Sequence, residues 1–339
     1  MISFRRPRQT GERLRRVVVW FTALVVCGNG NRLPAQGNAT CNAYAAGPFG
    51  GTTERNICNA GVDGAAVFVP VGGLLVAGGN PFLGATGSLG GFGHLGITLR
   101  LNGTQVVVPD FNYNGVGTKV AAHQILFAPA PLVEGAMGLF AGLPGGSLAV
   151  DLLGSAQLLP TNLIDDVHVD VTARRIGTVA LGFGVGARVT LLGERRTRPA
   201  VTVSVMRRSL PRIGIGSIPG GDSYQFASGL ADVGLRGVVG KRFGALDVGA
   251  GAGWTDYTAD ADIYVANPVT RLAEPPIQLH INDFRAMGFV DAGLALRSVY
   301  LIAEAGVQRG RDLKLVTTFA GNDPAEDRFF ASVGLRFGF

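Results

Sequence analysis

Two short stretches of this chain combine histidine with nearby carboxylates, residue types that bind divalent cations or serve hydrolytic enzymes. The first places four such residues within six positions: Asp165, Asp166, His168 and Asp170. Closely spaced carboxylates in a flexible loop suit Ca²⁺. The second places Asp283 three residues after His280. A solvated acidic loop is the simpler interpretation, so we expect no metal ion and no cofactor, and we keep a surface hydrolase that uses His168 or His280 as an alternative.

The chain lacks the common signatures of nucleotide binding and nucleophilic catalysis. Residues Gly91-Phe-Gly93-His-Leu-Gly96 match the pattern G-x-G-x-x-G. They lead into an alternating segment instead of a helix, so they do not form a dinucleotide-binding turn. No P-loop, paired C-x-x-C or G-x-S-x-G motif is present. Enzymatic activity is therefore a secondary hypothesis.

Most of the chain from residue 91 onward alternates bulky apolar residues with small or polar ones. In 178–191, for example, Val179, Leu181 and Phe183 share one face, while Gly182 and Gly184 share the other. A period of two is typical of a β-strand with two unlike faces. We expect ten strands: 91–102, 131–142, 147–158, 178–191, 198–209, 223–241, 244–255, 276–297, 299–308 and 331–339. Strands of about 9–11 residues can cross a bilayer, whereas those of soluble sheets usually have only about 5–6.

The expected connections alternate in length. Short turns are expected at 143–146, 194–198, 242–245 and 296–298, and longer polar loops at 159–174, 210–222, 257–275 and 312–326. This alternation predicts an all-β fold, a closed antiparallel transmembrane β-barrel with its long loops at one end. Residues 103–130 form a further long loop in the ten-strand count. A strand pair there, or at 61–77, would make twelve strands, and both together would make fourteen.

The composition favours a membrane barrel over a soluble domain. Hydrophobic residues make up 47% of the chain and charged residues only 16%, and 52 residues are glycine. A soluble protein would be short of polar surface, whereas a barrel can turn its apolar residues toward lipid. Beyond the N-terminus, every apolar run is broken by Gly or Pro before it reaches 18 residues, which argues against a bundle of membrane-spanning helices.

The C-terminal strand carries a family resemblance. Its residues Ser332, Gly334, Phe337 and Phe339 resemble the C-terminal insertion signal of bacterial outer-membrane β-barrels. The resemblance implies the outer membrane of a Gram-negative-type bacterium as the location, with membrane lipid and the barrel-assembly machinery as partners. It also implies a periplasmic C-terminus, which places the short turns in the periplasm and the long loops outside.

The first 36 residues resemble a secretory signal peptide. They hold seven arginines against one glutamate, followed by the apolar run Val17–Val26. Without them, 23 of the 30 basic and 23 of the 24 acidic residues remain. The net charge of +6 therefore belongs to the export signal, and we expect no nucleic-acid partner.

Residues 37–89 precede the barrel of residues 90–339 and invite two interpretations. Cys41 and Cys58 are expected to form a disulfide, which would stabilise the fold by roughly 3 kcal/mol. The segment also holds an apolar run at 65–77 and a glycine-rich stretch. It could fill the barrel as a plug, for which inward glycines at 177–190 and 244–255 would leave room, or form a periplasmic extension or early strand pair. A plugged layout is similar to that of the FadL-type long-chain fatty acid and hydrocarbon transporters, but the likeness concerns layout and matches no individual residues.

The inward faces of the expected strands carry charges of both signs. They are Arg100, Glu134, Asp151, Arg188, Arg208, Asp232, Arg236, Asp247, Arg285, Asp291, Glu304 and Arg336. A strongly ion-selective pore is not indicated. The charges could pair with one another and fill the barrel, or line a permeation path. The function we expect is a passive channel or transporter for a small solute, apolar solutes included; the alternatives are a structural or adhesive barrel without an open pore, and the hydrolase.

Overall fold

The computed structural model describes residues 34–47, 50–160, 167–169, 175–176 and 179–338, and the statements below refer to these residues. All of them belong to one compact unit that runs from Leu33 to Phe339. Residues 1–33 of the expected signal peptide and Phe339 of the insertion signal lie outside the described residues.

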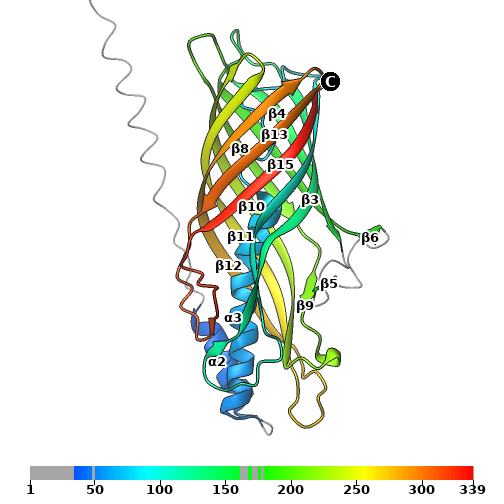
Figure 1. Cartoon of the computed structure of the whole chain (residues 1–339), viewed down its shortest axis with the longest axis vertical. Coiled ribbons are helices and arrows are strands. Elements are labelled where there is room, and N and C mark those ends of the chain that lie inside the picture. Colours follow the sequence, from blue (N-terminus) through cyan, green and yellow to red (C-terminus); the bar gives the residue numbers. More distant parts are fainter. Residues whose placement is uncertain (1–33, 48–49, 161–166, 170–174, 177–178, 339) are drawn as a thin grey trace, which may run out of the picture. The chain divides into compact units, whose positions relative to one another are not determined.

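Ten antiparallel strands close into a barrel (Figure 1). They are β1 (Leu95–Pro109), β3 (Ala122–Phe140), β4 (Ala149–Pro160), β7 (Val179–Leu192), β8 (Ala200–Ser209), β10 (Tyr224–Phe243), β11 (Leu246–Val265), β12 (Ile277–Leu296), β13 (Val299–Gln308) and β15 (Arg328–Gly338). The C-terminal strand completes the ring, because Leu335 pairs with Leu301 of β13 on one side and Leu99 of β1 on the other. Each of the ten expected segments overlaps one of these strands, so the ten-stranded barrel is confirmed.

Short turns gather at the end of the barrel where the C-terminus lies, and long loops gather at the opposite end (Figure 1). The turns are 141–148, 193–199, 244–245 and 297–298, and the fully described loops are 110–121, 210–223, 266–276 and 309–327. The loops carry short pieces: β2 (Lys119–Val120) pairs with β14 (Thr318–Phe319), β5 (Val167–Val169) with β9 (Ile213–Ile215), β9 also with β10, and β6 (Arg175–Ile176) with β7. A 3₁₀ turn, η1, covers Ile218–Gly220.

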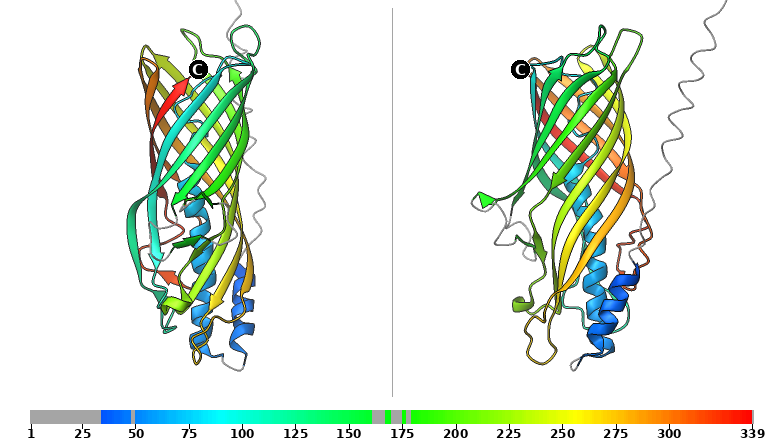
Figure 2. Two further views of the ribbon diagram at one scale, coloured as in Figure 1. Left: turned by 90° about the vertical axis from the view of Figure 1, so that its right-hand side faces the viewer. Right: turned by 180° about the vertical axis from the view of Figure 1, so that it is seen from behind.

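Residues 61–77 form part of a helix and not a strand pair, and 103–130 adds only the ends of β1 and β3 to the barrel. The helix is α3 (Thr52–Ala77), preceded by the shorter α2 (Pro34–Ala45). α3 is long and apolar enough to cross a membrane, and 78% of that stretch is buried inside the protein. An all-round apolar helix is stable where its whole surface is covered. From Ile57 onward most residues of α3 are buried, and the strands that surround this part of the helix supply the cover (Figure 2).

Strands β10, β11 and β12 have 20 residues each, about twice the length that a bilayer crossing needs. Along β11 the outward residues are apolar up to Trp254 and polar from Asp256 onward, and the inward residues change from Asp247 to Tyr257 and Ile263. Trp254 lies beside Phe284 of β12, with ring centroids 6.4 Å apart. The change of polarity places the edge of the lipid-facing band at this aromatic pair.

We call the strand residues beyond this pair the outer extension; they are 224–232 of β10, 256–265 of β11 and 277–283 of β12. The expected loop 257–275 is therefore wrong in its first half, because the period of two continues there with the apolar residues on the other face. The inward residues pack on α3: Ile263 lies against Gly61, and Phe226 lies against Gly64. The expected disulfide is confirmed and joins Cys41 of α2 to Cys58 of α3.

Candidate functional site

The candidate site is the barrel lumen, in which the twelve charged residues expected to face inward are all buried. Five ion pairs form among them: Arg100 with both Glu134 and Glu304, Arg188 with Asp151, Arg208 with Asp232, and Arg336 with Asp247. Arg285 pairs with Asp283 of its own strand. Buried charges are costly unless they are paired. These contacts give most of the charged set an ion-pair partner.

The chain that follows α3 runs through the lumen, and we call residues 78–94 the lumen strap. Gly78 lies beside Arg100, Phe82 beside Gly96, and Thr86 beside Gly240. At its far end, Gly91 lies against Gly138 and Ala141, where β3 gives way to its short turn. The strap therefore passes from the middle of the barrel to the short-turn end, where β1 begins.

Carboxylates of the barrel wall accept hydrogen bonds from the strap backbone. The amides of Gly79 and Asn80 donate to Glu304 of β13 at 3.0 and 2.6 Å. The amide of Leu83 donates to Glu134 of β3 at 3.1 Å, and that of Leu89 donates to Asp151 of β4 at 3.2 Å. Four strap amides thus have a charged acceptor on the wall.

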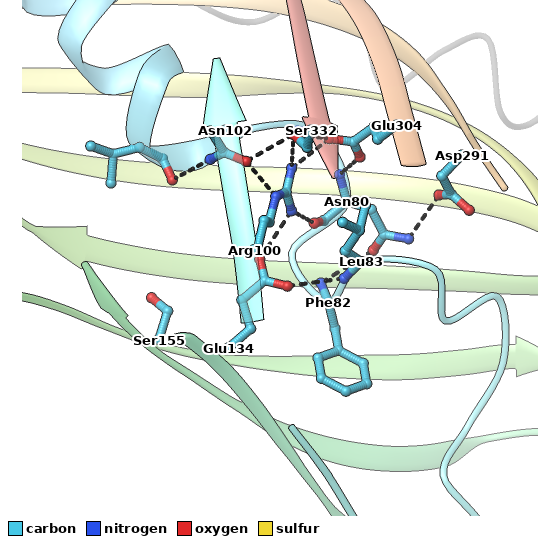
Figure 3. A network of polar contacts seen from close by, with 12 residues as sticks. Asn80, Phe82, Leu83, Arg100, Asn102, Glu134, Ser155, Asp291, Glu304 and Ser332 are labelled. Carbon is cyan, nitrogen blue, oxygen red and sulfur yellow. Dashed lines mark hydrogen bonds and ion pairs between the residues drawn. The ribbon is translucent and has the colours of Figure 1, made fainter. Parts of the chain in front are cut away.

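Arginines of the wall donate to the strap carbonyls. Arg100 donates to the carbonyl of Asn80 at 2.7 Å, and Arg188 donates to that of Ala85 at 3.2 Å. Arg236 donates to the carbonyl of Gly79 at 3.1 Å. Figure 3 shows Arg100 at the centre of this network, between Glu134, Glu304 and the strap.

Polar side chains complete the network. Arg100 donates to Ser332 at 2.9 Å and also contacts Asn102, which donates to the carbonyl of Val76 at 3.1 Å. Asn80 donates to Asp291 at 3.0 Å. Sequence reasoning singled out the wall charges but not Asn80 or Asn102, because a lone amide in a glycine-rich segment carries no periodic signal.

The mixed signs of the lumen have a physical explanation in the strap. A backbone without helix or sheet pairing presents both donors and acceptors, and each costs free energy if it is buried without a partner. Acidic side chains satisfy its amides and arginines satisfy its carbonyls. The wall therefore needs both signs to hold an irregular segment inside a barrel, and this arrangement is a binding site for the protein's own chain.

The inward glycines make room in two different ways. On β7 and β11, most of them accommodate wall residues: a Cβ on Gly251 would lie 2.3 Å from the ring of Phe289, and one on Gly184 would lie 2.5 Å from Ser155. Elsewhere they make room for the strap, as Gly240 does for Thr86 and Gly96 for Phe82. Inward glycines therefore do leave space for the segment 37–89 at Gly240 and Gly96. Most of the glycines at 177–190 and 244–255, on which that expectation rests, leave space for wall residues instead.

Gly240 gives a direct test of this packing. A Cβ at Gly240 would lie 2.1 Å from Cγ2 of Thr86, whereas one at Gly237, on the lipid-facing side of the same strand, would meet its nearest atom at 3.9 Å. We expect Gly240→Ala to lower the free energy of unfolding by about 1–3 kcal/mol through overpacking. Gly237→Ala should change it by less than about 0.5 kcal/mol. Urea unfolding of both variants in lipid vesicles measures the difference, and equal effects would contradict a tightly packed strap.

α3 carries a buried acidic residue, Asp63. Asp63 accepts hydrogen bonds from the amides of Val316 and Thr317, at 3.0 and 2.7 Å, and so joins the helix to the loop before β15. Burial raises the pKa of Asp63 to about 6, although the two amide hydrogen bonds act in the opposite direction. The folded protein therefore holds this proton at a higher pH than the unfolded chain does.

This raised pKa predicts that the folded state is more stable in acid, even though protonation makes Asp63 a weaker acceptor for the two amides. Stability from the Asp63 proton is complete below about pH 4, is lost as the pH rises to about 6, and amounts to about 3 kcal/mol over that interval. The free energy of unfolding in lipid vesicles, measured by urea titration, should therefore decrease over this range by about that amount more in the wild type than in Asp63→Asn. An equal pH dependence in Asp63→Asn would refute the assignment.

The candidate catalytic and metal-binding residues are not brought together in the part of the chain that the structure describes. His280 faces outward and contacts Asp260 at 2.8 Å, with both side chains exposed. Asp283 faces inward and binds Arg285 and Arg311, so the expected pairing of His280 with Asp283 is wrong, because an odd spacing in a strand puts the two on opposite faces. Among the described residues, there is no group of three or more His, Cys, Asp or Glu that could hold a metal ion.

Some of the predicted site residues lie outside the part of the chain that the structure describes, or are described by their backbone alone. Asp165, Asp166 and Asp170 lie outside the described residues, and His168 is placed only by its backbone in β5. Of the insertion signal, Ser332 faces inward and binds Arg100, and a Cβ on Gly334 would meet Leu83 of the strap at 3.4 Å. Phe337 pairs in register with Ile97 and Val299. The role of these residues in membrane insertion stays a prediction.

Comparisons with known proteins give similarity of a general kind. No family model and no curated protein sequence matches the chain. Among solved structures, the translocator domain of autotransporter NalP from Neisseria meningitidis is 13% identical, with a TM-score of 0.42, covering 81% of this chain and 97% of that one. The outer membrane protease OmpT from Escherichia coli is 10% identical, with a TM-score of 0.41 and coverages of 73% and 97%. A Pseudomonas aeruginosa FadL homologue is 10% identical, with a TM-score of 0.21 and coverages of 78% and 96%. Values this low carry no functional argument, and the barrel fold stands on the strand pairing itself.

Proposed function

We propose that this outer-membrane β-barrel is sealed by its own chain and acts as a membrane anchor for the structures at its long-loop end. The observation that carries the proposal is the occupied lumen. Four wall carboxylate bonds and three arginine bonds hold the strap backbone inside the barrel. A small barrel has an interior little wider than its own side chains, so an extra backbone and a helix leave little space for a solute path.

The position of the hydrophobic core supports the same role. The largest buried cluster lies between α3 and the inward face of the outer extension, with Tyr224, Phe226 and Ile263 among its members. This core lies beyond the aromatic pair Trp254 and Phe284, which places it outside the lipid-facing band. A protein that needed only a pore would have no use for a packed, disulfide-linked structure at that end.

The expected passive channel would require the strap to leave the lumen. Its release would expose Glu134, Glu304 and Arg100 to water, so the lumen would then offer charges of both signs. The hydrolase alternative has no assembled residue set to support it among the described side chains. The sealed anchor therefore accounts for more of the structure than either of the other functions.

Single-channel recording in planar bilayers tests the seal. We expect the full chain to insert without stable conductance steps, and a variant that lacks residues 52–89 to conduct. Stable steps from the full chain would overturn the proposal. A folded deletion variant that stays closed would also overturn it, because the segment would then not be the seal. Resistance of the barrel to protease in vesicles serves as the control for insertion.

A further inference from the structure

Along the chain, α3 and the strap contact successive levels of the barrel. At the start of α3, Asn56 donates to the carbonyl of Gly115 in the β1–β3 loop at 2.9 Å. About two turns further along, Asp63 binds the β13–β15 loop, and Gly73 then lies against Tyr257. The helix thus starts among the long loops and descends into the barrel.

The other end of this segment is fixed by strand register. Gly96, the second residue of β1, pairs with Gly338, the last residue of β15. β1 therefore starts at the short-turn end, and the strap connects it to a helix that began at the long-loop end. Residues 52–95 cross the full height of the barrel on the inside, in the direction from the long loops to the short turns.

We propose that the chain is threaded through its own barrel, so that the α2–α3 hairpin lies on the outer side of the membrane. This inference rests on the outer-membrane location and the periplasmic C-terminus, and it goes beyond the seal. It means that the barrel delivers α2 and the start of α3 to the cell surface. The strap is the part of the chain that remains within the membrane.

The disulfide locks the threaded state. Cys41 and Cys58 hold α2 beside the outer part of α3, and both sulfurs are buried. One helix with its side chains is about 10–12 Å across, so a pair is about twice as wide as the single helix that the lumen accommodates. Once the bond has formed, the hairpin cannot pass back through the barrel as a folded unit.

Native lysines provide the controls for a topology experiment. Lys119 and Lys314 lie in the long loops and are exposed, whereas Lys241 donates to the carbonyl of Arg196 at the short-turn end. Asn42 is an exposed residue of α2, so Asn42→Lys adds one amine to the hairpin. Intact cells are treated with a membrane-impermeant amine reagent, and modified peptides are identified by mass spectrometry, with the wild type as the matched control.

We expect the introduced amine to be modified to about the same extent as Lys119 and Lys314, and Lys241 only after lysis. If the introduced amine reacts only after lysis while Lys119 and Lys314 react in intact cells, threading is overturned and the barrel orientation stands. If only Lys241 reacts in intact cells, the orientation itself is overturned. An epitope inserted between Ala46 and Gly47, read by antibody on intact cells, gives an independent reading if Asn42→Lys does not assemble.

Discussion

Replacing Arg100 with methionine should release the lumen strap and lower the free energy of unfolding by about 3–5 kcal/mol. Arg100 is buried and contacts Glu134, Glu304, Ser332 and the carbonyl of Asn80. Without it, two carboxylates remain in the lumen without their shared cation, and a strap carbonyl loses its donor. Hydrogen exchange at Gly79, Asn80 and Leu83, together with urea unfolding, should reveal the loss.

Arg208→Met is the matched control. Arg208 is also buried in the barrel wall, and its ion pair is with Asp232 of the neighbouring strand. The two variants should both lose stability, but only Arg100→Met should expose the strap amides and produce intermittent conductance. If the strap amides of Arg100→Met stay as protected as in the wild type, the network does not hold the strap. Equal exposure in Arg208→Met would attribute the effect to general loosening of the barrel.

The strands within the lipid band could be predicted from sequence because lipid and lumen impose opposite demands on alternating residues. Leu181 and Val185 face out and Arg188 faces in, so a period of two is enough to find β7 and its faces. Beyond the lipid-facing band, the outward residues meet water and the inward residues pack on α3, so the polar and apolar faces exchange places. In β11 the residues after Trp254 still alternate, but Asp256 faces out and Tyr257 faces in. A pattern of apolar residues on one constant face ends there, which is why the sequence predicts a loop for the outer half of β11.

α3 could not be identified by periodicity because it is buried on all sides. Its residues 65–77 form an apolar run interrupted by Pro70 and Gly72, which is compatible with a strand or a helix. Helix propensity is poor for such a run, so packing against the outer extension must supply the stabilisation. The sequence suggested a segment inside the barrel, but its direction of entry depends on contacts such as Asn56 with Gly115.

The charged residues of the lumen could be predicted by position but not by partner. Alternation alone placed Arg100 and Glu304 on inward faces, although 204 residues separate them in sequence. Together the two residues bind the backbone of Gly79 and Asn80, in a strap that has no regular secondary structure. Such contacts leave no repeating pattern in a single sequence.

The boundary of the lipid band gives the second large prediction. Val290 lies on the outward face of β12, 58% exposed, between Ala250 and Ala305 of the neighbouring strands. An arginine near the bilayer midplane of a β-barrel costs about 2–4 kcal/mol. We therefore expect Val290→Arg to lower the free energy of unfolding in lipid vesicles by that amount, as measured by urea titration.

Gln278→Arg supplies the control, because Gln278 is exposed on the outward face of the same strand but lies beyond Phe284. An exposed, solvated position should tolerate the change within about 0.5 kcal/mol. A cost at Gln278 similar to that at Val290 would move the membrane edge outward and place the core around α3 within the bilayer. A negligible cost at Val290 would mean that this face does not contact lipid. The expected contrast between two substitutions 12 residues apart on one strand locates the membrane edge along it.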